Sequence, residues 1–143
     1  MLIDTLRDWP IHAALMLTGL ILVGIAIIIA RKKKIITKWV VKHKFIAIFG
    51  VFSCLAGLGL GIRMVGENFN NHINTIHSVF GLISICLLST TPIIGQSIFW
   101  AAKQKNKSIK KIRSIRLIHK WLGRTSLLVV LVTIILGVIR LFF

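Results

Sequence analysis

Residues 11–34 read IHAALMLTGLILVGIAIIIARKKK, a long apolar run that ends in four consecutive cations. Pro10 stands directly before the run, a position that suits the first turn of a helix because proline lacks an N–H. An α-helix needs roughly 20 apolar residues to cross the hydrocarbon core of a bilayer. The run has no small-residue cleavage site of the kind that ends a signal peptide. We therefore expect it to be retained as a transmembrane helix.

Three further apolar segments follow the same plan, each bounded by charged or polar residues. The four predicted spans are Trp9–Ala30, Phe45–Val65, Ile76–Ala101 and Leu117–Phe143. With their flanking residues, the helices should cover about 9–30, 39–65, 74–101 and 115–141. The sequence thus predicts an all-α fold: one membrane-embedded domain over residues 1–143, built as an up-down-up-down transmembrane four-helix bundle.

Composition agrees with this class of fold. The chain is 56% hydrophobic, and Lys and Arg number 19 against 3 Asp and Glu. Its mean hydropathy is +0.88 and its pI is about 11.4. Such a pI is also found in nucleic-acid-binding proteins, but here the cations stand in blocks between apolar runs. We expect no nucleic-acid partner.

The charges differ sharply between the two sides that alternating spans create. Segments 31–44 and 103–124 hold 16 of the 19 cations and no acid, whereas Asp4, Asp8 and Glu67 all fall on the other side. The positive-inside rule places the basic loops in the cytoplasm and both termini outside. We expect a multi-pass protein of a bacterial inner (plasma) membrane, with membrane lipids, especially anionic ones, as partners.

One histidine stands near the start of each predicted helix. These are His12, His43, His77 and His119, and His72 lies in the outer loop. Ionisable groups in a membrane span are costly and usually functional, although one near a helix end can simply sit among headgroups. Because successive helices reverse direction, the first and third histidines share one depth, and the second and fourth share the other.

Glycines recur on the faces of these histidines. Gly19 and Gly50 follow His12 and His43 by seven residues, and Gly81 and Gly123 follow His77 and His119 by four. Steps of four and seven return to the same helix face, and glycine lets a flat group approach the backbone. A porphyrin whose two axial positions are filled by facing imidazoles fits this pattern, and such a site suits electron transfer rather than substrate binding.

Other residues near the histidines keep more than one interpretation. Zinc would need three or four ligands, and no carboxylate or cysteine stands near either pair. Met16 could be an axial ligand, but packing is favoured because a second histidine is available. Lys120 and Arg124 could pair with haem propionates or reach lipid phosphates. The role of Gln96 stays open, and His72 is expected to be a solvated loop residue.

Several of these residues resemble one known family. The stretch from His12 through Met16 to Gly19 resembles the first core helix of cytochrome b561 domains, closest to those that are fused elsewhere to DOMON domains. His77-Ser-Val-Phe-Gly81, with Gln96 further along, resembles the third core helix. His43 with Gly50 and His119 with Gly123 occupy the matching places on the second and fourth helices.

The resemblance implies a four-helix core that holds two b-type haems by bis-histidine ligation, near opposite membrane faces. His12 and His77 would bind the outer haem, and His43 and His119 the inner one, the same pairing that topology predicts. The implied function is electron transport between a reductant and an acceptor on opposite faces, with ascorbate-, quinol- or ferric-reductase-like oxidoreductase activity left open. Full-length eukaryotic members have six spans, whereas residues 1–143 hold four and no DOMON domain.

The sequence leaves open the electron donor, the electron acceptor and the oligomeric state. The electron partners can be small molecules or proteins, and a homodimer is one option. Alternatives are a cytochrome b linked to quinol or superoxide, and a small haem-free membrane protein that binds lipid or a partner, or assists assembly. A proton- or cation-coupled transporter is disfavoured because the apolar spans contain no acid.

The pairing leads to a first testable prediction. His12→Ala and His77→Ala should each remove the same haem, because each deletes one of two axial ligands, and His43→Ala and His119→Ala should each remove the other. Reduced-minus-oxidised visible spectra and haem content per chain measure this. Two members of one pair that lose different haems would contradict the pairing.

Overall fold

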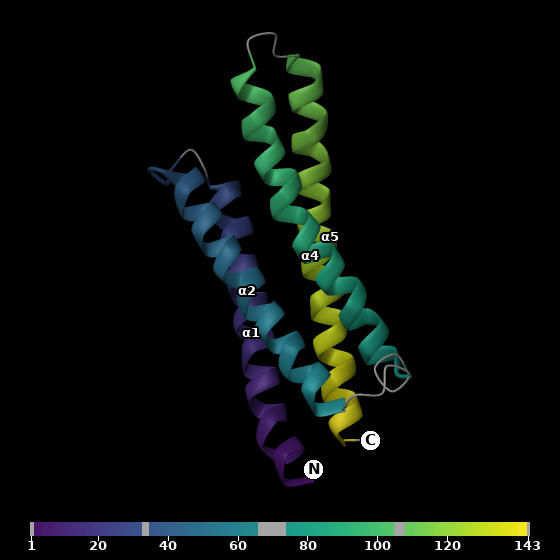
Figure 1. Ribbon diagram of the computed structural model, residues 1–143. Coiled ribbons are helices and arrows are strands. Elements are labelled where there is room, and N and C mark those ends of the chain that lie inside the picture. The colour runs from purple at the N-terminus through teal and green to yellow at the C-terminus, as the bar shows by residue number, and fades with distance from the viewer. Residues whose placement is uncertain (1, 33–34, 66–73, 105–107, 143) are drawn as a thin grey trace.

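The computed structural model describes residues 2–32, 35–65, 74–104 and 108–142, with side chains from residue 8 to residue 140. Helices dominate this part of the chain, and it contains no strand. The helices are α1 (Leu2–Arg31), α2 (Trp39–Val65), α4 (Ile76–Lys103) and α5 (Ile109–Phe142) (Figure 1). All four are long and apolar enough to cross a membrane, which confirms the predicted all-α transmembrane fold.

The helix ends differ from the prediction at two places. Helix α1 begins at Leu2, so Pro10 lies inside the helix and not in its first turn, and that prediction is wrong. Helix α5 begins at Ile109, six residues before the predicted start at 115. Apolar content marks only the part of a helix that lies in hydrocarbon. A helix can continue beyond it wherever charged side chains reach water.

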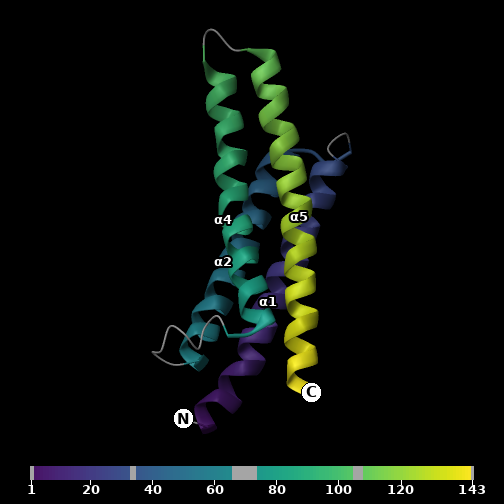
Figure 2. The ribbon, with the colours of Figure 1, turned by 90° about the vertical axis from the view of Figure 1, so that its right-hand side faces the viewer.

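The four helices form two hairpins. Helix α1 packs along α2 and α4 along α5, while α1–α5 and α2–α4 make the lesser contacts between the hairpins. Consecutive helices run in opposite directions, and both labelled termini lie at one end of the bundle (Figures 1 and 2). At the opposite end, the α4–α5 hairpin extends further than the α1–α2 hairpin.

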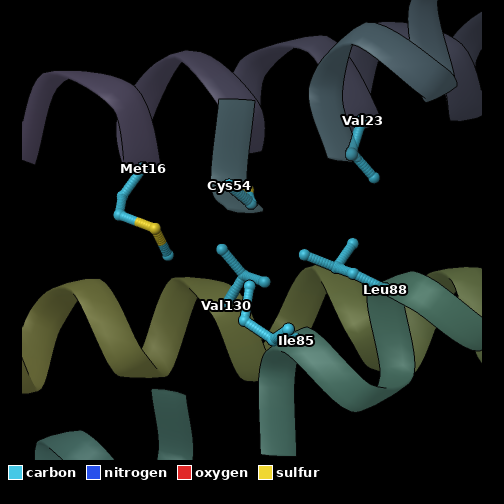
Figure 3. Packing of buried hydrophobic residues seen from close by; sticks show 6 residues of the cluster. All are labelled: Met16, Val23, Cys54, Ile85, Leu88 and Val130. Atoms are coloured by element: carbon cyan, nitrogen blue, oxygen red, sulfur yellow. The ribbon is translucent and has the colours of Figure 1, made fainter. Parts of the chain in front are cut away.

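A small apolar cluster fills the middle of the bundle, with side chains from all four helices. Its members are Met16, Val23, Cys54, Ile85, Leu88 and Val130 (Figure 3). Side chains from the two hairpins point toward one another there. Most other large apolar side chains are exposed, as lipid-facing residues of a membrane bundle must be, because lipid tails are as apolar as leucine.

The second hairpin repeats the spacing of the first. Adding 65 to a residue number in α1, or 76 to one in α2, gives the corresponding position in α4 or α5. The buried Gly50, Cys54 and Gly57 of α2 correspond in this way to Ser126, Val130 and Thr133 of α5, which are also buried. The bundle is therefore built from two structurally equivalent halves whose residue identities differ.

The two helices of each hairpin are joined by different contacts in the two halves. In the first hairpin, a Cβ added at Gly19 would collide with Cys54 Sγ and lie 2.9 Å from the carbonyl oxygen of Gly50. In the second, the position of Gly19 is taken by Ser84, whose hydroxyl is hydrogen-bonded to Thr133 Oγ1 at 2.9 Å. Close backbone approach and hydroxyl pairing are both common ways to join membrane helices.

Gly19→Ala should destabilise the bundle, because the new methyl group overpacks the contact between α1 and α2. We expect a loss of about 1–3 kcal/mol, measured as a lower thermal unfolding midpoint by circular dichroism in detergent. Gly24→Ala, on the same helix, is the matched control, since a Cβ there meets nothing within 4 Å. Equal midpoints for the two variants would contradict the packing role of Gly19.

Candidate functional site

Four histidines form two pairs across the bundle. The first pair is His12 of α1 and His77 of α4, whose ring centroids lie 6.3 Å apart with an interplanar angle of 78°. The second pair is His43 of α2 and His119 of α5, with centroids 6.1 Å apart and an angle of 89°. Each pair joins the two hairpins, so each hairpin supplies one imidazole to each pair.

These separations leave room for one metal ion between the rings. An imidazole nitrogen binds a metal at about 2.0–2.1 Å, so two opposed rings that share a metal have centroids about 6 Å apart. Among the described residues, no group of three or more His, Cys, Asp or Glu side chains gathers to hold a metal. Two protein ligands suit a haem iron, whose porphyrin supplies the other four nitrogens, better than they suit zinc.

Hydrogen bonds to backbone carbonyls hold all four rings through Nδ1. The bonds join His12 to Gly57 (2.7 Å), His43 to Ala26 (2.9 Å), His77 to Thr133 (2.9 Å) and His119 to Thr91 (3.1 Å). A carbonyl oxygen can only accept, so Nδ1 must carry the proton in each ring. The Nε2 of a neutral imidazole then keeps its lone pair for a metal, and such a bond orients a ligand histidine and raises its basicity.

The carbonyl acceptors obey the same repeat as the histidines. Ala26 and Thr91 are 65 residues apart, and Gly57 and Thr133 are 76 residues apart. Each acceptor lies on the other helix of its own hairpin. The two helices of a hairpin thus orient each other's histidine, before the hairpins meet.

Three glycines that the sequence analysis did not single out make space for the rings. A Cβ at Gly61 would lie 3.2 Å from His12 Cε1, one at Gly95 2.9 Å from His119 Cε1, and one at Gly137 2.8 Å from His77 Cε1. Each of them follows a histidine on its own helix by 18 residues, which is five full helical turns: Gly61 follows His43, Gly95 follows His77 and Gly137 follows His119. The spacing places each glycine on the face of its own helix's histidine, and the structure shows that each one contacts the histidine of another helix.

The four glycines that were singled out lie at helix contacts. Gly19 and Gly50 are buried where α1 meets α2. A Cβ at Gly81 or Gly123 would make ordinary contact with a threonine methyl group, Thr133 Cγ2 at 3.7 Å or Thr91 Cγ2 at 3.8 Å. Their structural role is therefore packing within the hairpins, and a face presented to a cofactor stays a prediction.

The remaining predicted site residues lie in three environments. Met16 is buried in the central apolar cluster and packs against Gly57. Lys120 is exposed, and Arg124 is half-buried with its guanidinium group 5.4 Å from the centroid of the Trp121 ring.

Near the second pair, Lys44 Nζ donates a hydrogen bond of 2.9 Å to Gln96 Oε1, which links α2 to α4. Lys44 Nζ also lies 5.0 Å from the centroid of the Phe99 ring. The prediction for His72 falls outside the described residues.

An ion pair between a buried aspartate and an exposed arginine marks the end of the bundle near the first pair. Asp8 is 4% exposed and its carboxylate lies 3.0 Å from the Arg63 guanidinium, which ties α1 to α2. The sequence predicts Asp8 only as a charge of the outer side, and Arg63 also as a possible partner of the outer haem's propionates. Asp8 stands one helical turn before His12, so the ion pair fixes the helices that carry and contact this ring.

A family model described as eukaryotic cytochrome b561 matches residues 11–143, a segment that includes all four paired histidines. No curated protein and no solved structure matches the chain.

Gly137→Ala should weaken haem binding, because the added methyl group would push the His77 ring from its position. Changes to the groups that orient a metal ligand cost about 10–100-fold in affinity, so we expect a loss of that size in titrations of haem-free protein with haemin. Gly59→Ala is the control, since a Cβ there meets nothing within 4 Å. Equal affinities in the two variants would show that the space at Gly137 is not needed.

Proposed function

The chain belongs to the cytochrome b561 family, whose members are haem-binding transmembrane electron-transfer proteins, and from this we propose that it is a di-haem electron carrier. One b-type haem would be held by His12 and His77, and a second by His43 and His119. The two sites would pass electrons between a reductant and an acceptor on opposite membrane faces.

The observation that carries this proposal is the geometry of the two histidine pairs. Ring separations of 6.3 and 6.1 Å suit a shared iron, and all four Nδ1 atoms are occupied by carbonyl oxygens. A haem held by these imidazoles would supply one-electron redox chemistry. That chemistry supports a carrier and disfavours an enzyme that binds substrate at the metal.

The protein's own residues would separate the two sites. The central apolar cluster, which includes Cys54, Val130 and Leu88, fills the bundle between the levels of the two pairs. It would exclude water and ions from the path between the sites, so that charge would cross this layer as electrons alone. The ion pair of Asp8 with Arg63 would hold the helix ends beside the first pair.

Charge supports one orientation of the chain. Arg31, Lys38 and Lys44 are among the exposed cations at the end of the bundle that holds the second pair. Because cytoplasmic loops are rich in Lys and Arg, we infer that the second pair lies on the cytoplasmic side and the first pair outside. We propose a bacterial plasma membrane as the location.

Haem content of the purified protein tests the proposal. We expect two b haems per chain from a pyridine haemochrome assay, and a reduced-minus-oxidised spectrum of the b type in detergent. Ascorbate, a quinol and a reduced protein donor can then be compared as reductants. Two imidazole pairs must both be intact for full loading, so the variant His12→Ala/His43→Ala should contain no haem.

The same variant should keep the circular dichroism of four helices, which separates loss of ligands from loss of fold. Haem-free protein from cells supplied with haem would overturn the proposal. It would leave a membrane bundle that binds lipid or a protein partner.

A further inference from the structure

The second hairpin is longer than the repeat requires. The residue numbers of equivalent positions differ by 76 between α2 and α5 but by 65 between α1 and α4. The stretch of chain that joins equivalent positions is therefore 11 residues longer in the second hairpin than in the first. Arg31, where α1 ends, corresponds to Gln96, and Trp39, where α2 begins, corresponds to Ile115. We define the tip as the described residues 97–104 and 108–114. These residues lie outside the helical segments that correspond to α1 and α2, so they are not needed to position the histidines.

The tip extends beyond the end of the first hairpin. Helix α4 continues to Lys103, and α5 begins at Ile109, so each helix gains six or seven residues, or about 10 Å at 1.5 Å per residue. Figures 1 and 2 show this projection. The end of the tip therefore lies beyond the last residues of the first hairpin.

The tip is strongly basic. Lys103, Lys110, Lys111 and Arg113 are all exposed. No acid within the chain lies near them in sequence, because all three Asp and Glu residues precede residue 68. Ile109 is 80% exposed beside these cations. Cations clustered without an acid near them in sequence form a positive surface that attracts acidic partners.

We propose that the tip is the docking surface for an acidic redox protein that exchanges electrons with the site of His43 and His119. Anionic lipids would meet Arg116, Lys120 and Arg124, which lie deeper along α5. The redox role of the partner rests on the proposed function. The docking itself depends only on charge and reach.

The test uses the full haem-loaded chain in nanodiscs of phosphatidylcholine, with reduced plant-type ferredoxin as an acidic one-electron donor. In each transfer the ferredoxin is oxidised by one electron and a ferric haem is reduced by one. Stopped-flow absorbance gives the rate of haem reduction over a range of ionic strength, and biolayer interferometry gives ferredoxin binding. The tip variant is K110E/K111E/R113E. The matched control, R31E/K32E/K38E, makes the same change of charge at the end of the first hairpin.

We expect the tip variant to lower the association rate at low ionic strength by about tenfold or more, and to lose most of its salt dependence, because charge complementarity steers encounter. The control should stay within about twofold of the wild type, since its charges lie lower and away from the tip. Reduction by a neutral quinol should be equal in all three proteins, which shows that the haem sites are intact.

Equal losses in the two variants would overturn the proposal, because the effect would then come from the overall positive field. So would an absence of ferredoxin binding to the wild type. Binding to phosphatidylserine vesicles that the tip variant alone loses, with ferredoxin rates unchanged, would assign the tip to lipid instead. If the chain held no haem, the proposed function would fail, while interferometry would still decide the docking.

Discussion

Each paired histidine donates its Nδ1 proton to a carbonyl oxygen on the neighbouring helix of its hairpin, and the rest of the site depends on this bond. An imidazole within a membrane span has no water to satisfy it. A backbone carbonyl in a helix still has a free lone pair, and it offers that acceptor at a fixed position. The bond therefore satisfies one ring nitrogen, selects the tautomer and leaves the other nitrogen for a ligand at the centre of the bundle.

The membrane fold could be predicted from the sequence because lipid allows few alternatives to an apolar helix of about 20 residues. The depth of each histidine followed from the alternation of the spans. The end of a helix in water is less constrained, which is why the starts of α1 and α5 were misplaced. Sequence alone also could not show which faces meet. Gly137 lies five helical turns after His119 on the same face, but the sequence does not show that it contacts His77, since that contact joins residues 60 positions apart.

The repeat between the hairpins escaped the sequence analysis for a related reason. Several equivalent core positions keep their burial but not their identity, as Gly19 and Ser84 or Cys54 and Val130 illustrate. A glycine that allows close contact and a serine that forms a hydroxyl bond meet the same packing requirement by different chemistry. What the halves share is therefore a geometric constraint on each histidine and its carbonyl partner, and alignment of letters does not detect such a constraint.

A two-fold axis along the bundle, through the centre of each histidine pair, would exchange His12 with His77 and His43 with His119. One hairpin therefore encodes a complete half of both sites, including its own carbonyl acceptors. For protein design, this means that the framework can be reduced to a single helical hairpin that associates with a copy of itself. Every ligand would then be specified twice by one gene segment. Any asymmetry between the halves, such as the longer tip, becomes a feature that the designer can add to one copy at will.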